Sequence, residues 1–424
     1  MDPATLTAPN PVRGGSGGRS GAQRPLVASL AITQTVGYGV LYYAFSALLG
    51  PMSRDLGIST ATAAGALTTA VLVTGLMSVP VGRWLDAHGG HALMTTGSLL
   101  GVAGILGWSQ VHSTAQLYGM FVVIGAASAM VLYGPAFAVV VAVTEPRSRT
   151  NALLGITLVA GFASSIFIPL TGRLVDGHGW RHTLLILAAV LAAITVPLHA
   201  IALRRTTPRC SGSQRNHRVT SPQRVLHDPG FWLLSAASVL RSAALAVIAV
   251  HLVLYLTTLG HPPAVAATLA GLLGLMSVTG RVVTTLSLRW LPMATIAAGI
   301  LVIQGAAISL LPFAGRHLAG AIVCLVLFGL GFGVASIATP AILLDRYGST
   351  GYATIAGTLA TPVLIAKASA PLGAAILAGT IGYRPVIQAV AGACITAGVF
   401  LALTSRIQAP VSQPPASAAA KLPG

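Results

Sequence analysis

The chain has 424 residues, of which 54% are hydrophobic and only 7% are charged. Soluble domains carry roughly a quarter charged residues, so this composition excludes an ordinary soluble enzyme and indicates that most of the chain lies in lipid. The formal charge of +17 does not indicate nucleic-acid binding. Most of the arginines lie in short segments between apolar runs, and cytoplasmic loops of membrane proteins are enriched in arginine and lysine.

Apolar runs long enough to cross a bilayer follow one another along the chain. A spanning helix needs about 20 such residues at a rise of 1.5 Å each. The runs predict an all-α membrane protein with twelve transmembrane helices, near residues 26–49, 61–82, 92–110, 116–138, 152–171, 182–203, 231–257, 264–287, 293–313, 318–339, 353–377 and 384–404.

The longest polar stretch between spans divides the chain into two halves. Residues 204–230 carry six arginines and predict a cytoplasmic linker between six-helix bundles at 25–203 and 231–404. Residues 1–24 are rich in Gly, Ser, Pro and Arg and predict a disordered cytoplasmic N-terminus, and 405–424 predict a disordered cytoplasmic tail.

Orientation follows from the lysines and arginines outside the spans. With the N-terminus inside, 16 of the 24 lie in cytoplasmic segments and five on the opposite side. The positive-inside rule therefore predicts cytoplasmic termini in a multi-pass protein of a bacterial-type inner membrane.

The two halves repeat one another in sequence. GLMSV at Gly75 to Val79 recurs at Gly274 to Val278, roughly 200 residues later, and further pairs follow in the same order. A parallel duplication relates the halves by an axis along the membrane normal and predicts a substrate path between them. The further pairs are Pro135-Ala136 with Pro340-Ala341, and Trp180-Arg181 with Tyr383-Arg384.

The loop after the second span holds Gly82, Arg83, Asp86 and Gly89. This pattern, joined to twelve spans and a basic central loop, resembles the major facilitator superfamily over about residues 25–405. The resemblance implies alternating access, with this loop motif acting in the conformational change. Gly90 and His91 stand where the family usually has basic residues. The charged contact that this loop makes in the family is therefore expected to be weak here or to use Arg83.

Further motifs resemble the branch that holds monocarboxylate transporters and oxalate:formate exchangers. They are the run Tyr38 to Tyr43 (YGVLYY), span 7 from Phe231-Trp232 to His251-Leu252, Gly280-Arg281 in span 8 and Lys367 in span 11. In those relatives the span 8 arginine, and in the oxalate exchanger also a span 11 lysine, bind substrate carboxylates. The resemblance implies that role for Arg281 and Lys367.

Arg241, Arg281 and Lys367 are the Lys and Arg residues placed inside predicted spans, and no Asp or Glu lies in any span. A cation at the membrane centre costs about 2.5–3.5 kcal/mol on insertion scales, so three without counter-charge need a reason. An organic anion that enters a water-filled cavity would supply the missing counter-charge. The alternatives are hydrogen bonds to carbonyls for Lys367 and an interfacial anchor for Arg281.

Neutral polar groups on spans 1 and 4 add candidate substrate contacts. Gln34, Tyr42 and Tyr133 offer amide and phenol donors, although aromatic residues in spans also serve as packing or as an interface belt. At helical spacing Tyr38 and Tyr42 share a face with Gln34, while Tyr43 turns away.

Proton coupling lacks its usual groups. Symporters of the monocarboxylate type share an Asp one turn before the span 8 arginine, and this chain has Ser277 at that position. Of the side chains inside the predicted spans, only His251 is of a type that titrates near neutral pH without a large shift. His251 is either a proton or gating group or a packing histidine. Anion exchange is therefore favoured over proton symport.

Other functions are left as alternatives. A drug or metabolite exporter of the same fold would need cavity acids for bulky cations, and a non-transporting receptor stays open. An enzyme is not expected, because the spans hold no nucleophile with a base. The three cysteines show no metal-ligand spacing. We expect no metal, no cofactor and a monomer whose partners are the anion and the bilayer.

The charge count generates a topology test. Cysteines introduced as Ser213→Cys and Ser412→Cys should resist an impermeant thiol reagent applied outside intact cells, and should react once the membrane is permeabilised. Labelling of either in intact cells contradicts the predicted orientation.

Overall fold

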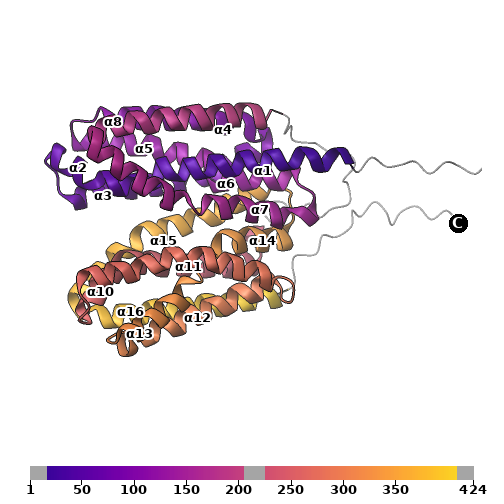
Figure 1. Ribbon diagram of the computed structural model, residues 1–424. Coiled ribbons are helices and arrows are strands. Elements are labelled where there is room, and N and C mark those ends of the chain that lie inside the picture. The colour runs from indigo at the N-terminus through magenta and orange to yellow at the C-terminus, as the bar shows by residue number, and fades with distance from the viewer. Residues whose placement is uncertain (1–16, 205–224, 408–424) are drawn as a thin grey trace, which may run out of the picture.

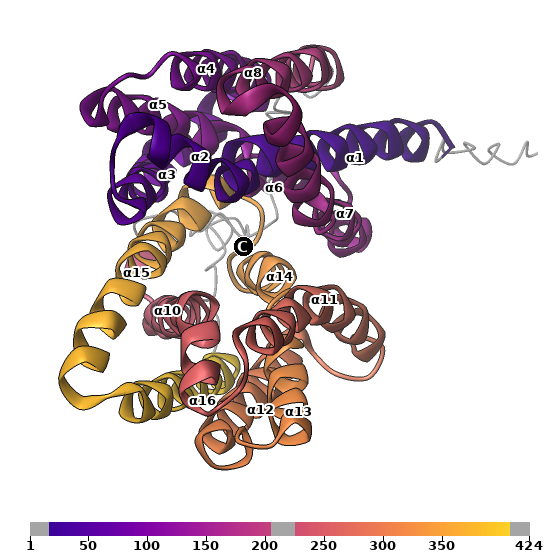
Figure 2. The same cartoon turned by 60° about the vertical axis from the view of Figure 1, so that its left-hand side comes forward.

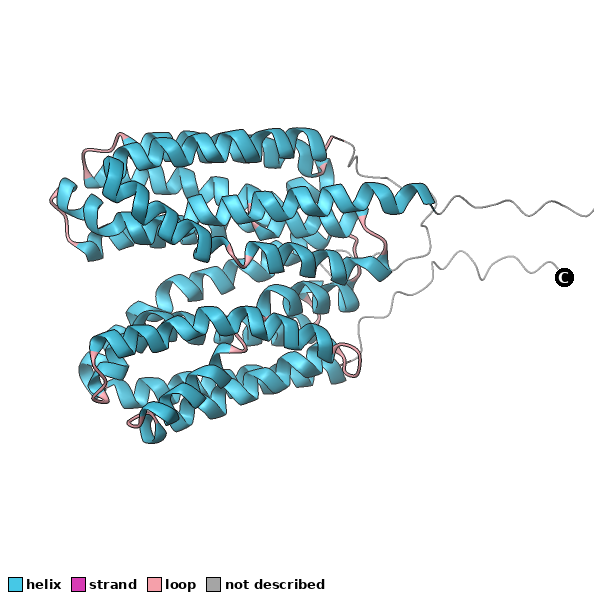
Figure 3. Cartoon of the chain, viewed as in Figure 1, coloured by secondary structure: helices cyan, strands magenta, loops and turns pink. Residues whose placement is uncertain are grey.

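The computed structural model describes residues 17–204 and 225–407, and within them all regular structure is helical (Figure 3). The helices of the amino-terminal half are α1 (Gly17–Tyr38), the π-helical turn η1 (Gly39–Tyr43), α2 (Ala44–Leu56), α3 (Thr60–His88), α4 (Gly90–Ser109), α5 (Thr114–Val131), α6 (Tyr133–Val143), α7 (Pro146–Ala160) and α8 (Ala163–Ala202).

The carboxy-terminal half is built in the same way. Its helices are α10 (Pro229–Thr258), α11 (Pro263–Ser287), α12 (Met293–Ala314), α13 (Leu318–Gly329), α14 (Ala335–Tyr347), α15 (Tyr352–Ile381) and α16 (Tyr383–Arg406). Most of the predicted linker, at 205–224, lies outside the described residues, as do most of the two predicted tails.

Ten helical stretches of the described residues are long and apolar enough to cross a membrane. One of them, at 151–202, has 52 residues and turns at Gly179, so it contributes two spans. The interrupted pair α13 and α14 forms the remaining one. The twelve-span, all-α fold predicted from the sequence is confirmed.

The helices form two bundles that lie side by side, the amino-terminal one indigo to magenta and the carboxy-terminal one orange to yellow (Figure 1). The start of α1, the end of α8, the start of α10 and the end of α16 lie at one end, here called the terminal end (Figure 1). One hydrophobic core, which includes Leu26, Val139 and Tyr347, joins both halves there. Toward the far end each half has its own core, and the bundles diverge (Figure 1).

The sequence repeat corresponds to repeated backbone features. Gly179 and Gly382, each just before a matched aromatic-Arg pair, have φ of 75° and 81°, a conformation that glycine adopts without strain. Span 4 breaks at Leu132, and span 10 breaks between Gly329 and Ala335. Both breaks lie at corresponding positions of the two halves.

A buried ion pair fastens the terminal end of the carboxy-terminal bundle. Arg346 Nε lies 3.0 Å from Asp228 Oδ2, with both side chains under 10% exposed. The Tyr347 hydroxyl donates to the same carboxylate at 2.6 Å, and Arg346 Nη1 donates to the carbonyl oxygens of Thr404 and Ile407. The cluster thereby joins the start of α10 to the ends of α14 and α16.

Asp228→Asn should destabilise the protein by about 3–5 kcal/mol, because it leaves Arg346 buried without its counter-charge. Burial disfavours the charged carboxylate, but hydrogen bonds from Arg346, Tyr347 and the Gly230 amide outweigh it and hold the pKa of Asp228 below its ordinary 3.8. The contribution should therefore be full at neutral pH and be lost only as the pH falls below 3.8.

Thermal unfolding of the detergent-purified protein measures this effect. The matched control is Asp55→Asn, which removes the exposed ion pair between Asp55 and Arg181 and should cost under about 1 kcal/mol. Equal midpoints for the two variants would contradict a structural role for Asp228.

Candidate functional site

Lys367 lies in the middle of α15, on the carboxy-terminal side of Thr361 and Leu364, which contact Gly75 of α3. Its side chain is exposed although it is far from both helix ends. Its Nζ lies 5.1 Å from the centre of the Tyr42 ring, which η1 of the other bundle supplies. The lysine therefore faces the space between the halves and contacts an aromatic face, an arrangement that stabilises a cation.

Four tyrosines of the amino-terminal half gather beside this lysine. Tyr38 and Tyr133 have ring centres 4.5 Å apart, Tyr42 and Tyr43 are 5.2 Å apart, and Tyr38 and Tyr43 are 6.4 Å apart. The prediction that Tyr43 turns away is wrong. In η1 the Ala44 amide bonds to the Gly39 carbonyl five residues back, so the wider turn brings residue 43 onto the face of Tyr38.

Arg281 of α11 reaches from the carboxy-terminal half to the amino-terminal half. Its Nη1 donates to the Thr157 carbonyl at 2.8 Å, in the last turn of α7, and its Nε donates to the Gly333 carbonyl at 3.4 Å, in the break between α13 and α14. Each carbonyl accepts a second bond, from the Gly161 amide to Thr157 at 3.0 Å and from the Ser336 hydroxyl to Gly333 at 2.8 Å. Nη2 has no partner among the described residues, which leaves one side of the fork for a ligand.

The electrostatic field of this region is positive. Tyr43 lies within electrostatic reach of both Lys367 and Arg281, and Tyr133 lies within reach of Arg281. Every acidic residue in the described part of the chain lies at or near a helix end or in a loop. Two cations and a set of phenols therefore face one another with no carboxylate, which suits a negatively charged ligand.

Two of the predicted substrate contacts lie elsewhere. Gln34 is fully buried inside the amino-terminal bundle, where its Nε2 donates to the Val131 carbonyl at 2.7 Å. That carbonyl lacks its helical partner because Pro135, four residues on, has no N–H. Arg241 lies within the carboxy-terminal bundle, in a cavity whose lining among the described residues comes from that bundle.

His251 is buried at 7% exposure and joins α10 to α15 and α16. Its Nε2 lies 2.9 Å from the Pro371 carbonyl, and its Nδ1 lies 3.2 Å from the Tyr383 hydroxyl. A carbonyl only accepts, so Nε2 carries the proton and Nδ1 accepts from the tyrosine in the neutral ring. Both nitrogens are used in packing contacts within one bundle.

The loop motif closes the terminal end through Asp86. Its carboxylate accepts from the backbone amides of Ala353 and Thr354 at 3.2 and 2.8 Å, and from the Thr354 hydroxyl at 2.6 Å. These groups form the first turn of α15, where free amides and the helix dipole favour a negative charge. Arg83 is exposed, and no partner of its side chain is found in the described residues. The contact uses Asp86, not Arg83.

Helices α3 and α15 touch backbone to backbone along this closed end (Figure 2). A Cβ on Gly82 would collide with the Ala353 carbonyl, and a Cβ on Gly357 would collide with the Ser78 carbonyl. The Thr361 hydroxyl donates to the Gly75 carbonyl at 2.8 Å. Lys367 lies less than two turns beyond Thr361, so the candidate site lies next to the α3–α15 contact.

Sequence reasoning misses several of these contacts. No periodicity announces the π turn that recruits Tyr43, and none announces the backbone carbonyls that bind Arg281. The small residues of α3 and α15 are a usable signal, because glycines at helix interfaces allow backbones to approach in membranes.

Two helical bundles with repeated breaks, closed at one end around a central polar cluster, define a membrane transporter that works by alternating access. The sequence model of the Major Facilitator Superfamily matches residues 30–363. The chain belongs to that superfamily. No curated protein matches it in sequence.

Solved structures of the same fold cover most of the chain. The Escherichia coli fucose:proton symporter has a TM-score of 0.71 at 14% identity, covering 90% of this chain and 99% of its own. The human organic anion transporter MFSD10 has a TM-score of 0.71 at 16% identity, with 89% and 99% covered. A proton:xylose symporter has 0.68 at 10%, with 92% and 95% covered. At these identities the likeness shows the fold alone.

Gly82→Ala should weaken the closed terminal end by about 1–3 kcal/mol, because the added methyl forces α3 and α15 apart. The readout is the labelling rate of a Thr361→Cys reporter, in a background without native cysteines, by a reagent applied from the terminal side. Faster labelling is expected with Gly82→Ala. Gly172→Ala, whose Cβ meets nothing within 4 Å, is the control and should leave the rate unchanged. An unchanged rate in a folded Gly82→Ala variant contradicts the proposed closure.

Proposed function

We propose that this transporter carries a small organic anion, a mono- or dicarboxylate, between the two bundles, and that it works by anion exchange. The observation that carries the proposal is the pair Arg281 and Lys367, which face the amino-terminal half with no carboxylate beside them. Unpaired cations at membrane depth are costly, and a substrate carboxylate would supply the missing charge.

The chemistry of the cluster divides the work of binding. Arg281 offers a planar fork with Nη2 free, which suits bidentate contact with a carboxylate, whereas Lys367 is a point charge that attracts without fixed geometry. The phenols of Tyr42, Tyr43 and Tyr133 can donate hydrogen bonds without adding charge. A ligand with one carboxylate near each cation, or one carboxylate and a polar tail, matches this set.

The conformation supports entry from one side. Contacts of Asp86, Thr361 and Arg281 close the terminal end, and the halves diverge toward the far end (Figure 1). With the terminal end cytoplasmic, as the positive-inside count predicts, this is the outward-facing state.

Exchange is favoured by the lack of a carrier for protons. No acidic residue lies in the interior of a described span, and both nitrogens of His251 contact groups of its own bundle. A loaded carrier returns readily because the anion neutralises Arg281 and Lys367, while an empty one exposes two charges during the transition. The fucose and xylose transporters of the same fold are proton symporters. Proton symport by this chain would need another titratable group.

Lys367→Gln should raise the half-saturating substrate concentration at least about 30-fold and nearly abolish exchange, since one lost charge contact of this kind costs about 2–5 kcal/mol. Arg281→Gln should do the same, and Arg281→Lys should be impaired because a point charge does not reproduce the fork. The assay is exchange of labelled carboxylates by reconstituted vesicles.

The exposed Arg289 at the end of α11 supplies the matched control. Arg289→Gln removes an equal charge outside the cluster and should leave exchange near the wild-type rate. Wild-type affinity and rate in a monodisperse Lys367→Gln variant would refute the anion site and assign that lysine to structure.

A further inference from the structure

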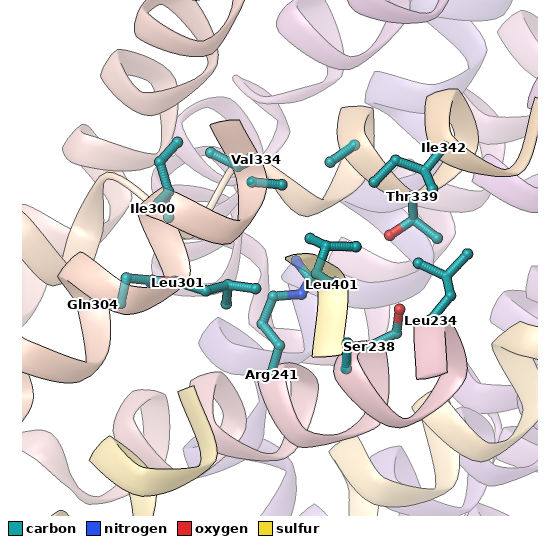
Figure 4. Close-up of a pocket in the computed structure, with 14 residues that line it drawn as sticks. Leu234, Ser238, Arg241, Ile300, Leu301, Gln304, Val334, Thr339, Ile342 and Leu401 are labelled. Carbon is teal, nitrogen blue, oxygen red and sulfur yellow. The ribbon is translucent and has the colours of Figure 1, made fainter. Parts of the chain in front are cut away.

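A second positively charged space lies inside the carboxy-terminal bundle (Figure 4). The cavity is lined by α10, α12, α14, α16 and the break before α14, and its lining includes no residue of the amino-terminal half. Its volume of about 30 Å³ admits about two water-sized particles. It is therefore separate from the cluster between the bundles and too small for most carboxylate substrates.

Arg241 supplies the charge of this cavity. It lies near the middle of α10, and no hydrogen bond or ion pair of its guanidinium is found in the described residues. The titratable group that interacts with it electrostatically is the thiol of Cys394 on α16, and a thiol is a weak acceptor. A guanidinium held in a bundle interior without an acceptor leaves five N–H donors unsatisfied, so the cavity needs an occupant that accepts.

Two hydroxyl groups complete the donor set. Ser238 lies one turn before Arg241 on the same face of α10, and Thr339 faces them from α14. In Figure 4 the hydroxyl oxygens of Ser238 and Thr339 lie near one another, and Leu401 lies between them and the Arg241 guanidinium in that view. An anion at the guanidinium would compensate the charge of Arg241, whereas a water would leave that charge uncompensated.

Gln304 accounts for the rest of the space. It is fully buried, and its Nε2 donates to the Phe328 carbonyl at 2.6 Å, while its Oε1 lacks a partner. Oε1 only accepts, so it calls for a water and not for an anion. An anion at Arg241 would meet its donors, and a water at Gln304 would meet the free acceptor of its amide.

We propose that this cavity binds a small inorganic anion of the halide class, with chloride as the physiological candidate, as a counter-ion that stabilises the carboxy-terminal bundle. The ion joins α10 to α14 across the break in span 10. It is a different ligand from the transported carboxylate, and its binding does not depend on the proposed function.

Chloride dependence of thermal stability tests the proposal on the detergent-purified full chain. Chloride or bromide replaces methanesulfonate, a polyatomic anion, at constant ionic strength. The unfolding midpoint of the wild type should rise by about 2 °C for each tenfold increase in halide once the site is filled. Arg241→Gln and Arg241→Met should lose this rise, whereas Lys367→Gln and Arg281→Gln should keep it.

A second measurement keeps the test decisive if a variant folds poorly. Bromide soaked into crystals of the wild type should give an anomalous peak beside Arg241. In halide-free buffer Arg241→Met should unfold at a higher temperature than the wild type, because it removes a buried charge without counter-ion. A wild-type midpoint independent of halide, or a rise that persists in Arg241→Met, would overturn the proposal and leave a cavity filled with water alone. Loss of carboxylate exchange with an intact halide effect would count against the proposed function only.

Discussion

The contact between α3 and α15 is the constraint on which the rest of the structure depends. Lipid gives no hydrophobic drive for two bundles to associate, so their interface must come from close packing and hydrogen bonds. Glycines at positions 82 and 357 let one backbone lie on the other, and Asp86 binds the first turn of α15. Because α15 is held there, Lys367 enters the central space at a fixed depth, opposite η1.

The three cations inside spans have different neighbours, and their neighbours separate their roles. Lys367 contacts an aromatic ring of the other half, Arg281 binds backbone carbonyls at a helix end and a helix break, and Arg241 lies in a cavity of its own bundle. A buried cation is tolerated only where acceptors or counter-ions surround it. A lysine or arginine inside a predicted span therefore marks three different places in this structure: the space between the halves, a contact between the halves and a separate cavity.

The sequence predicts the spans, the repeat and the cations because hydropathy, spacing and the cost of charge in lipid are local properties of the chain. It does not predict the π turn at Gly39–Tyr43, since one extra residue per turn leaves no mark on an apolar run, and so the face of Tyr43 is wrongly assigned. In the sequence Asp228 belongs to the predicted polar linker, and its ion pair with Arg346 becomes visible only in the folded structure. Gln34 shares a helical face with Tyr42 in an ideal helix, yet the carbonyl that Pro135 leaves free draws it into the bundle.

The repeat does not make the two halves contribute in the same way to the closed terminal end. Gly82 packs on the Ala353 carbonyl of the other half, whereas its sequence counterpart Gly280 packs on the Leu330 carbonyl of its own half. The second copy has no acid to bind a helix N-terminus across the interface. Opening the terminal end must therefore break two different contacts, the bonds of Asp86 to the first turn of α15 and the Arg281–Thr157 bond. A ligand shifts such an equilibrium only by its difference in affinity for the two states. Arg281 belongs to both the closure and the candidate site, so a carboxylate that competes with the Thr157 carbonyl for its guanidinium would loosen the closed end as it binds.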